Sequence, residues 1–161
     1  MQKLMSQAAI LALLLLAFAL RIFLLDGQSV WWDEGISLHL AGSSLSDIFS
    51  DRLDNIHPPL YFILLKGWLT LTGVTVFSAR YLSVLAGWLQ VALTYAVAAR
   101  WFDRRTGLAA AFLSAISAVS VIYAQEIRVY SLLPLAYLAL LAITRELTRP
   151  DFTAARKGWI L

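Results

Sequence analysis

The sequence predicts an all-α, multi-pass membrane protein in which a single domain contains about four transmembrane helices. Of its 161 residues, 60% are hydrophobic and 14% are charged, whereas roughly a quarter of the residues of a soluble domain are charged. The mean hydropathy is +0.74, and the apolar residues form several runs long enough to cross a bilayer. These values exclude a soluble globular enzyme and a disordered chain. The absence of cysteine also excludes a disulfide framework and thiolate chemistry.

The first transmembrane helix is expected over residues 7–25. The apolar run from Ala8 to Leu25 is broken only by Arg21 and can cross a hydrocarbon core of roughly 30 Å. A cleaved signal peptide is the alternative because Lys3 gives a basic start, but no small-residue cleavage site follows the run. Arg21 lies one turn from the end of the helix, so we expect its side chain to extend to the headgroup region.

Three further transmembrane helices are expected over residues 81–99, 107–123 and 131–147. Basic residues gather after the first of these and at the end of the last: Arg100, Arg104, Arg105, Arg145, Arg149, Arg156 and Lys157. The positive-inside rule places both segments, and the N-terminus, on the cytoplasmic side of the cell membrane. The net charge of +3 therefore reflects topology, and no nucleic-acid partner is expected.

Residues 26–80 form a long outer loop that we expect to carry interfacial helices. The stretch from Pro58 to Phe77 is apolar, but it contains Lys66 and begins with two prolines, so we expect it to lie on the outer face. If it crossed the membrane instead, the basic segments would lie outside. A short surface helix is expected where Ser44 or Ser46 can act as N-cap and apolar residues follow at helical spacing.

Two adjacent carboxylates, Asp33 and Glu34, follow the outer end of the first helix, between Trp32 and Gly35. A carboxylate beside indole rings at a membrane surface is partly desolvated, which makes it a better base at neutral pH. The alternative is a helix N-terminus, where acidic residues cap the chain and face the positive end of the helix dipole.

Two more polar groups lie at outer helix ends. His57 precedes two prolines that fix the backbone presenting it, so it could contact a substrate, although an end-capping or solvated histidine is the alternative. Glu126 and Arg128 lie at the hydrocarbon boundary, where charged groups usually face a protein interior or a water-filled cavity. Arginine suits a phosphate, and Tyr130 could stack on a sugar. A local ion pair between Glu126 and Arg128 is the alternative.

These groups share one predicted face of the membrane. Under the topology given by the basic residues, they all emerge on the extracytoplasmic face at the ends of different helices. We therefore expect a site at the bilayer surface for a phosphorylated lipid whose head group reacts outside the bilayer.

Five motifs run in this order along the chain: Trp32-Asp33-Glu34, His57-Pro58-Pro59-Leu60-Tyr61, Ala79-Arg80-Tyr81-Leu82-Ser83, the Arg100 to Gly107 turn, and Tyr123-Ala124-Gln125-Glu126-Ile127-Arg128-Val129-Tyr130. With these motifs the chain resembles the amino-terminal part of the GT-C membrane glycosyltransferases of family 39, which include protein O-mannosyltransferases. The resemblance extends to about residue 149. Members of the family are several times longer, so the resemblance implies a truncated product or a fragment of a longer enzyme.

The resemblance implies an inverting glycosyltransferase that moves a sugar from a polyprenyl-phosphate-linked donor to an extracytoplasmic protein, lipid or glycan. By this likeness Asp33 is the general base and Glu34 supports the acceptor or a bound cation. Glu126 binds a divalent metal or the acceptor, and Arg128 holds the donor phosphate. Glutamine and glutamate stand at positions 125 and 126, where several relatives have aspartate. Whether the enzyme uses a divalent metal, the one cofactor considered, therefore stays open.

Two other classes of protein remain as alternatives. A transporter fragment would use Asp33, Glu126 and Arg128 as ion or substrate ligands, and a membrane assembly subunit would have no site of its own. Transporters place charged sites near the bilayer midplane on broken helices. The charged groups of this chain are predicted at helix ends, which favours the enzyme.

Overall fold

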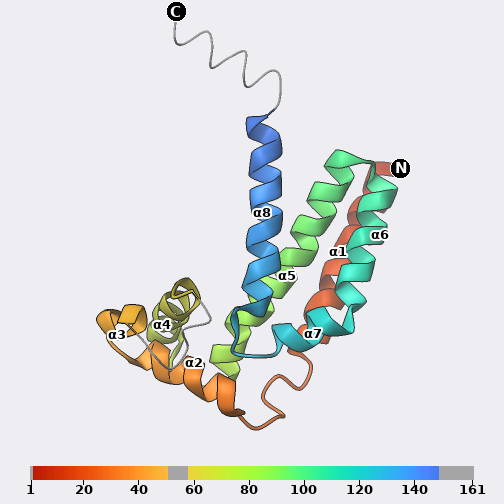
Figure 1. Cartoon of the computed structure of the whole chain (residues 1–161). Coiled ribbons are helices and arrows are strands. Elements are labelled where there is room, and N and C mark those ends of the chain that lie inside the picture. Colours follow the sequence, from red (N-terminus) through yellow and green to blue (C-terminus); the bar gives the residue numbers. More distant parts are fainter. Residues whose placement is uncertain (1, 51–57, 149–161) are drawn as a thin grey trace, which may run out of the picture.

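A computed structural model describes residues 2–50 and 58–148, and every regular element in these two ranges is helical (Figure 1). The elements are α1 (Gln2–Ile22), α2 (Trp32–Gly42), α3 (Leu45–Ser50), α4 (Leu60–Thr72), α5 (Val76–Trp101), α6 (Arg104–Ile116), α7 (Ala118–Ala124), the 3-10 turn η1 (Val129–Ser131) and α8 (Leu132–Leu147). The predicted all-α membrane fold is confirmed.

The helices α1, α5 and α6 form one bundle, and α8 crosses α5 beside it (Figure 1). The centre of the bundle is built from small side chains that let the helices approach closely, namely Ala17, Val91, Ala111 and Ala115. At one end of the bundle, Gly107 of α6 has no room for a Cβ atom, which would lie 2.8 Å from the Cβ of Ala99 in α5.

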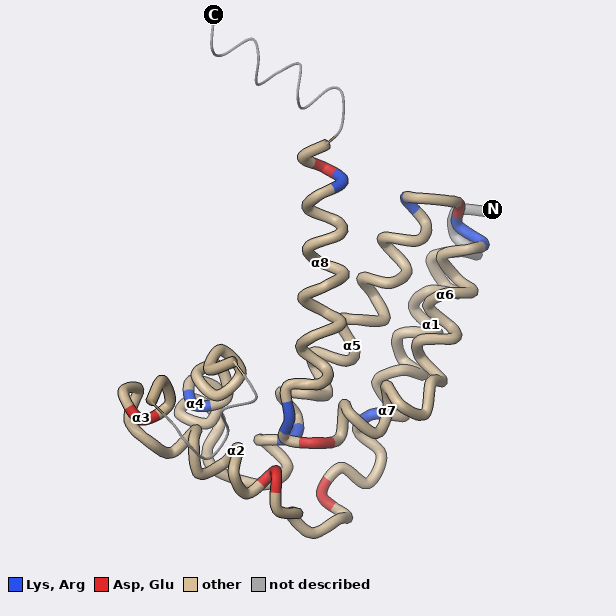
Figure 2. Tube along the Cα trace, in the orientation of Figure 1, with Lys and Arg blue, Asp and Glu red and all other residues tan. Residues whose placement is uncertain are grey.

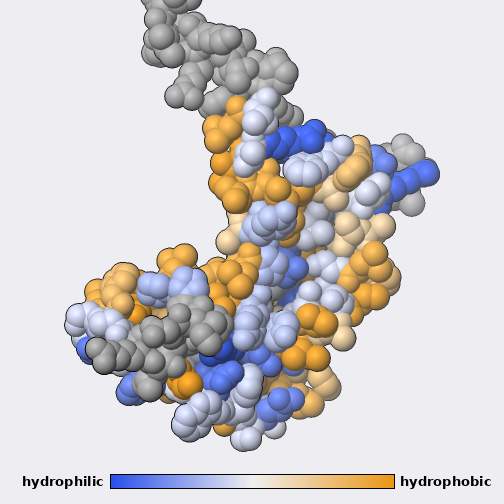
Figure 3. Space-filling view, in the orientation of Figure 1, coloured by the Kyte–Doolittle hydropathy of each residue, from blue (hydrophilic) through white to orange (hydrophobic). Residues whose placement is uncertain are grey.

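Among the described residues, two segments are long and apolar enough to cross a membrane, α5 and Val129–Leu147. A third candidate is the pair α6 and α7, provided that the bent pair counts as one span, whereas the apolar part of α1, Gln7–Ile22, is shorter. A total of four transmembrane helices therefore stays a prediction. Large apolar side chains are exposed along α8, including Leu133, Tyr137, Leu140 and Ile143, as expected for a surface that faces lipid (Figure 3).

The span expected as one helix over residues 107–123 is broken at Ser117, where α6 and α7 meet at an angle of 58°. Ser117 has φ −59° and ψ 116°, which takes the chain out of the helix, and its hydroxyl oxygen accepts a hydrogen bond from the backbone N–H of Ser120 at 3.4 Å. Ser117 thus caps α7. The other observed helices differ from the expected spans by a few residues: α1 ends at Ile22 and α5 begins at Val76.

The helices α2, α3 and α4 form a small helical lobe (Figure 1). Its core packs Leu40, Ile48, Phe62 and Leu65 against Ala79 of α5 and against Ile127 and Val129, which follow α7. Lys66 of α4 donates to the backbone oxygens at the end of α2, at 2.8 and 3.3 Å. The lobe is therefore fixed to the bundle.

The expectation for Arg21 was wrong. Its side chain is completely buried between α1 and α6, and it donates to the carbonyl oxygens of Ser114 and Ala115 at 3.2 Å. The break between α6 and α7 leaves carbonyl groups without helical partners, and these attract the guanidinium into the bundle.

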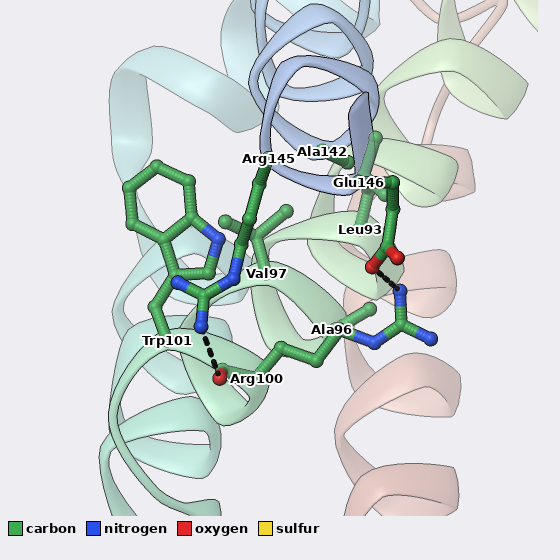
Figure 4. Close-up of a pocket in the computed structure, with 8 residues that line it drawn as sticks. All are labelled: Leu93, Ala96, Val97, Arg100, Trp101, Ala142, Arg145 and Glu146. Carbon is green, nitrogen blue, oxygen red and sulfur yellow. Dashed lines mark hydrogen bonds and ion pairs between the residues drawn. The ribbon is translucent and has the colours of Figure 1, made fainter. Parts of the chain in front are cut away.

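At the end of the bundle opposite the lobe, charged side chains near the C-terminal ends of α5 and α8 lie close together, and Figure 4 shows them in close-up. Arg100 and Glu146 form an ion pair at 2.9 Å, and the Arg145 guanidinium lies 5.5 Å from the centre of the Trp101 ring. Together with Leu93 and its apolar neighbours, these side chains line a partly open cavity of about 60 Å³. The groups contact one another and so link the two helices.

Candidate active site

Charged residues from three parts of the chain meet where α2, the start of α5 and the connection after α7 come together (Figure 2). Asp33 and Glu34 lie in the first turn of α2, and Arg80 lies near the start of α5. Glu126 and Arg128 belong to the connection between α7 and η1. The α6–α7 break and the lobe thus bring together the polar groups that the sequence predicted at helix ends.

Glu34 and Arg80 form a buried, two-pronged ion pair. The Arg80 Nη2 lies 2.7 Å from Glu34 Oε2, and Nε lies 2.9 Å from Oε1. The side chains are 4% and 0% exposed, respectively. The planar guanidinium matches both carboxylate oxygens, so the geometry fixes the orientation of the pair as well as its position.

Backbone groups supply the remaining hydrogen-bond partners of the Arg80 and Glu34 side chains. Arg80 also donates to the carbonyl oxygens of Leu25 and Gln28, at 2.8 and 3.0 Å, and Glu34 Oε1 accepts the backbone N–H of Ile127 at 3.0 Å. One ion pair therefore joins the exit of α1, the start of α2, the start of α5 and the segment after α7. These contacts position the surrounding polar groups.

Asp33 and Arg128 form a second, looser pair at the edge of this buried network. Arg128 Nη2 lies 3.7 Å from Asp33 Oδ2, and Nη1 donates to the backbone oxygen of Asp33 at 3.4 Å. The Asp33 side chain is 35% exposed, whereas that of Arg128 is 7% exposed. The Arg128 guanidinium also lies 5.5 Å from the centre of the Tyr130 ring. A carboxylate that reaches solvent beside a held guanidinium can take a proton while the cation binds an anion.

Glu126 faces a small polar cavity of about 70 Å³, with Glu34, Arg80 and Gln125 also in its lining. Its Oε2 is buried and has no hydrogen-bond partner among the described residues. Burial raises the pKa of the Glu126 carboxyl, and the negative charge of Glu34 raises it further. Glu126 can therefore hold a proton more readily than an ordinary carboxyl group.

An open groove lies along the first turns of α2. It is lined by Val30, Trp31, Trp32, Gly35, Ile36 and His39. Trp32 is 81% exposed, and Gly35 has no heavy atom within 4 Å of the Cβ it lacks. Asp33 is not among the residues that line this groove, so the partly desolvated setting expected for its carboxylate stays a prediction.

The remaining predicted ligands are not brought together by the described part of the chain. His57 lies outside the described residues. Within residues 2–50 and 58–148, no three histidine, aspartate or glutamate side chains converge in a way that could hold a metal ion. The predicted divalent metal at Glu126 thus stays a prediction.

Comparison with known proteins gives one match. Residues 56–155, more than half of the chain, match the family model described as dolichyl-phosphate-mannose-protein mannosyltransferase. The chain belongs to this family. It is thus a membrane glycosyltransferase chain of the GT-C type, as its motifs predicted. No curated protein and no solved structure matched it.

The part that matches the mannosyltransferase family contains Arg80, Glu126 and Arg128, whereas Asp33 and Glu34 precede it. The structure nevertheless joins the two parts, because Glu34 pairs with Arg80 and Asp33 lies beside Arg128. The cluster of charged groups therefore contains residues from the part that matches the family as well as the acidic pair that precedes it.

Arg80 was not predicted as a site residue, although it has the most polar contacts in the network. The sequence did contain a signal: Arg80 lies in the apolar beginning of a long helix, where an arginine needs a carboxylate or carbonyl partner. Its partner is distant in sequence, so the identity of that partner could not be read from spacing.

Proposed function

We propose that this chain carries the reaction centre of an inverting glycosyltransferase that moves a sugar from a polyprenyl-phosphate donor to an acceptor on the extracytoplasmic face. The observation that supports this most strongly is the pairing of a solvent-reaching carboxylate, Asp33, with a buried guanidinium, Arg128, at the same helix ends. The family contributes the class of reaction. The donor, acceptor and side of the membrane belong to the proposal.

Inverting transfer from a phosphate-activated sugar needs two groups. One removes the proton of the acceptor hydroxyl while that oxygen forms a bond to the anomeric carbon. The other stabilises the phosphate as the carbon–oxygen bond breaks and the phosphate leaves with the electron pair. Asp33 is assigned the first task because its side chain is 35% exposed. Arg128 is assigned the second because its planar guanidinium can bind two phosphate oxygens.

The other predicted residues take supporting roles in this proposal. Glu34 keeps Arg80 and the Ile127 amide in place, so its contribution to acceptor or cation binding would pass through that network. Glu126, with its raised pKa, would donate a hydrogen bond to a sugar or acceptor hydroxyl, or would release its proton to water and bind a divalent cation as the carboxylate. Tyr130 would stack on the sugar or head group, and His57 would contact substrate.

Replacement of Asp33 by asparagine tests the assignment of the base. In membranes that contain the protein, we expect Asp33→Asn to lower the rate of mannose transfer from dolichyl-phosphate mannose by about 10²- to 10⁴-fold, the usual effect of a general base. Membrane insertion should be unchanged because the asparagine has nearly the same shape.

The matched control is Asp26→Asn, which removes an exposed carboxylate from the connection that leads into α2. It should leave the transfer rate within about twofold. An Asp33→Asn variant that transfers sugar as fast as the unchanged protein would remove Asp33 from the role of base. Loss of transfer in Asp26→Asn alone would show that a carboxylate other than Asp33 acts as the general base.

A further inference from the structure

We propose that Arg21 and Gln125 form a reciprocal cap that locks α1 against the α6–α7 break and thereby positions Arg128 for the reaction. Arg21, from the end of α1, caps the end of α6, and Gln125, from the end of α7, caps the end of α1. This inference rests on the proposed function for its catalytic consequence. The cap itself can be tested separately.

The first half of the cap is the buried Arg21 guanidinium. Its Nη1 donates to the backbone oxygens of Ala17 and Ala115 at 3.1 and 3.2 Å, and its Nη2 donates to that of Ser114 at 3.2 Å. Ser114 and Ala115 lie in the last turn of α6, where carbonyl groups lack intrahelical partners.

The C-terminal end of α6 also stabilises the positive charge of Arg21. The C-terminal end of a helix carries a partial negative charge, so it attracts a cation. Within the described part of the chain, Arg21 forms no ion pair with a carboxylate, and all its hydrogen-bond acceptors are backbone oxygens. A completely buried guanidinium is costly unless such partners are fixed. The cap therefore favours the broken α6–α7 geometry over a straight helix, which would occupy those carbonyl groups.

The second half of the cap runs in the opposite direction. The side-chain amide nitrogen of Gln125 lies 3.3, 3.2 and 2.9 Å from the backbone oxygens of Leu20, Arg21 and Phe23. These oxygens belong to the last turn of α1 and the residues that follow it, so they also lack helical partners. Each of the two chain segments thus satisfies the helix end of the other.

The neighbouring helix leaves room for this contact. A Cβ atom on Gly87 of α5 would lie 2.9 Å from the Cβ of Ala124 and 3.1 Å from Nε of Arg21. Ala17, Ala115 and Ala124 are completely buried around it. The packing is tight at this point, so the guanidinium has little freedom to move.

The cap controls the segment that carries the proposed chemistry. Gln125 is followed directly by Glu126, then by Ile127, whose N–H binds Glu34, and then by Arg128. The segment is therefore held at its start by α1 and in its middle by α2. Removal of either half should let Arg128 move relative to Asp33, and a misplacement of about 1 Å can lower a catalytic rate by about 10²-fold. Arg21 and Gln125 are positioning residues, since they act through the segment that carries Arg128, although Gln125 also lines the small cavity that Glu126 faces.

The first test measures position without relying on activity. The chain has no cysteine, so spin labels on Trp32→Cys in α2 and Val119→Cys in α7, both exposed positions, give one distance distribution in the full chain. We expect Arg21→Ala and Gln125→Ala to broaden or shift this distribution. Arg145→Ala, which removes an arginine from the opposite end of the bundle, should leave it unchanged.

The second test uses transfer from dolichyl-phosphate mannose. We expect Arg21→Ala and Gln125→Ala each to lower kcat by about 10- to 100-fold. The double variant should lose little more than either single variant, because the two halves depend on each other. Arg21→Lys, which can still donate to the α6 carbonyls, should recover part of the rate. Two independent effects on folding would instead multiply in the double variant and would not be restored by lysine.

The outcomes separate this inference from the proposed function. If the unchanged protein transfers no sugar, the proposed function fails, and the distance measurement still decides the cap. If Arg21→Ala does not fold, Gln125→Ala and Gln125→Glu carry the test, since both remove the amide donor at a partly exposed position. An unchanged distance distribution and an unchanged kcat in the Gln125 variants would overturn the cap.

Discussion

At the scale of single residues, the buried Glu34–Arg80 pair dominates the site. The pair and its backbone partners are almost completely shielded from solvent. We expect Arg80→Met to lower the free energy of unfolding by about 3–5 kcal/mol, because it leaves a buried carboxylate without its cation. Glu34→Gln should cost less, because the amide oxygen can still accept the Ile127 N–H.

Unfolding in detergent, followed by circular dichroism, measures both effects. The control is Arg100→Met, since the Arg100–Glu146 pair is 64% and 40% exposed and such pairs are worth at most about 1 kcal/mol. Equal costs for Arg80→Met and Arg100→Met would contradict a structural role for the buried pair.

The raised pKa of Glu126 predicts a pH dependence of stability. The folded state holds the Glu126 proton more tightly than the unfolded state, so the favourable contribution of the neutral carboxyl is complete at acid pH and is lost as the pH rises through the raised pKa. Glu126→Gln, which stays neutral, should therefore melt at a higher temperature than the unchanged protein at neutral pH. The difference should vanish near pH 4, where an ordinary carboxyl is about half protonated. A difference that is constant with pH would show that the Glu126 carboxyl titrates at its ordinary pKa.

How far sequence predicts this site depends on the residue. Asp33 and Arg128 could be predicted to share a face because charge patterns gave the direction of each helix. The Glu34–Arg80 contact could not, because hydropathy does not fix the rotation of α5 about its axis. Arg21 was predicted at the headgroups from its distance to the helix end. Its true partners exist only because α6 breaks, which no pattern in the sequence had revealed.

At the scale of helices, the break at Ser117 decides the geometry of the site. The stretch over residues 107–123 is mostly apolar, with three serines but no charged residue and no proline, so sequence predicts one straight span. The structure ends α6 at Ile116 because Ser117 caps α7 and Arg21 occupies the carbonyls at the end of α6. The cause is thus partly tertiary, which explains why helix existence was predictable and helix continuity was not.

Two helical glycines provide a matched test of the packing around this break. Gly87 of α5 faces Ala124 and Arg21 at contact distance, whereas Gly67 of α4 has nothing within 4 Å of its missing Cβ. Gly87→Ala should destabilise the protein by about 1–3 kcal/mol through overpacking. Gly67→Ala should stabilise it by about 0.5–1 kcal/mol, since alanine favours the helix. The two free energies of unfolding in detergent should therefore change in opposite directions, and a stabilised Gly87→Ala variant would mean that α5 and α7 are not closely packed.

At the scale of the whole molecule, the two ends of the bundle differ in composition. The N-terminus of α1, the α5–α6 connection and the C-terminal end of α8 lie together at one end, and the lobe with the proposed site lies at the other (Figures 1 and 2). The end remote from the site carries Arg100, Arg104, Arg105 and Arg145. The positive-inside rule predicts that this end is cytoplasmic and, with it, that the proposed site faces the extracytoplasmic side.

Single cysteines test this orientation directly, because the chain contains none of its own. A membrane-impermeant maleimide added to intact cells should label Trp32→Cys, whose native side chain is 81% exposed at the start of α2. It should label Arg104→Cys, at the exposed start of α6, only after the membrane is permeabilised. Both cysteines react with the reagent in detergent, so a difference on intact cells reports sidedness and not burial. The opposite pattern would place Asp33 and Arg128 on the cytoplasmic side, and an extracytoplasmic acceptor would then be impossible even if the residues at the site kept their proposed roles.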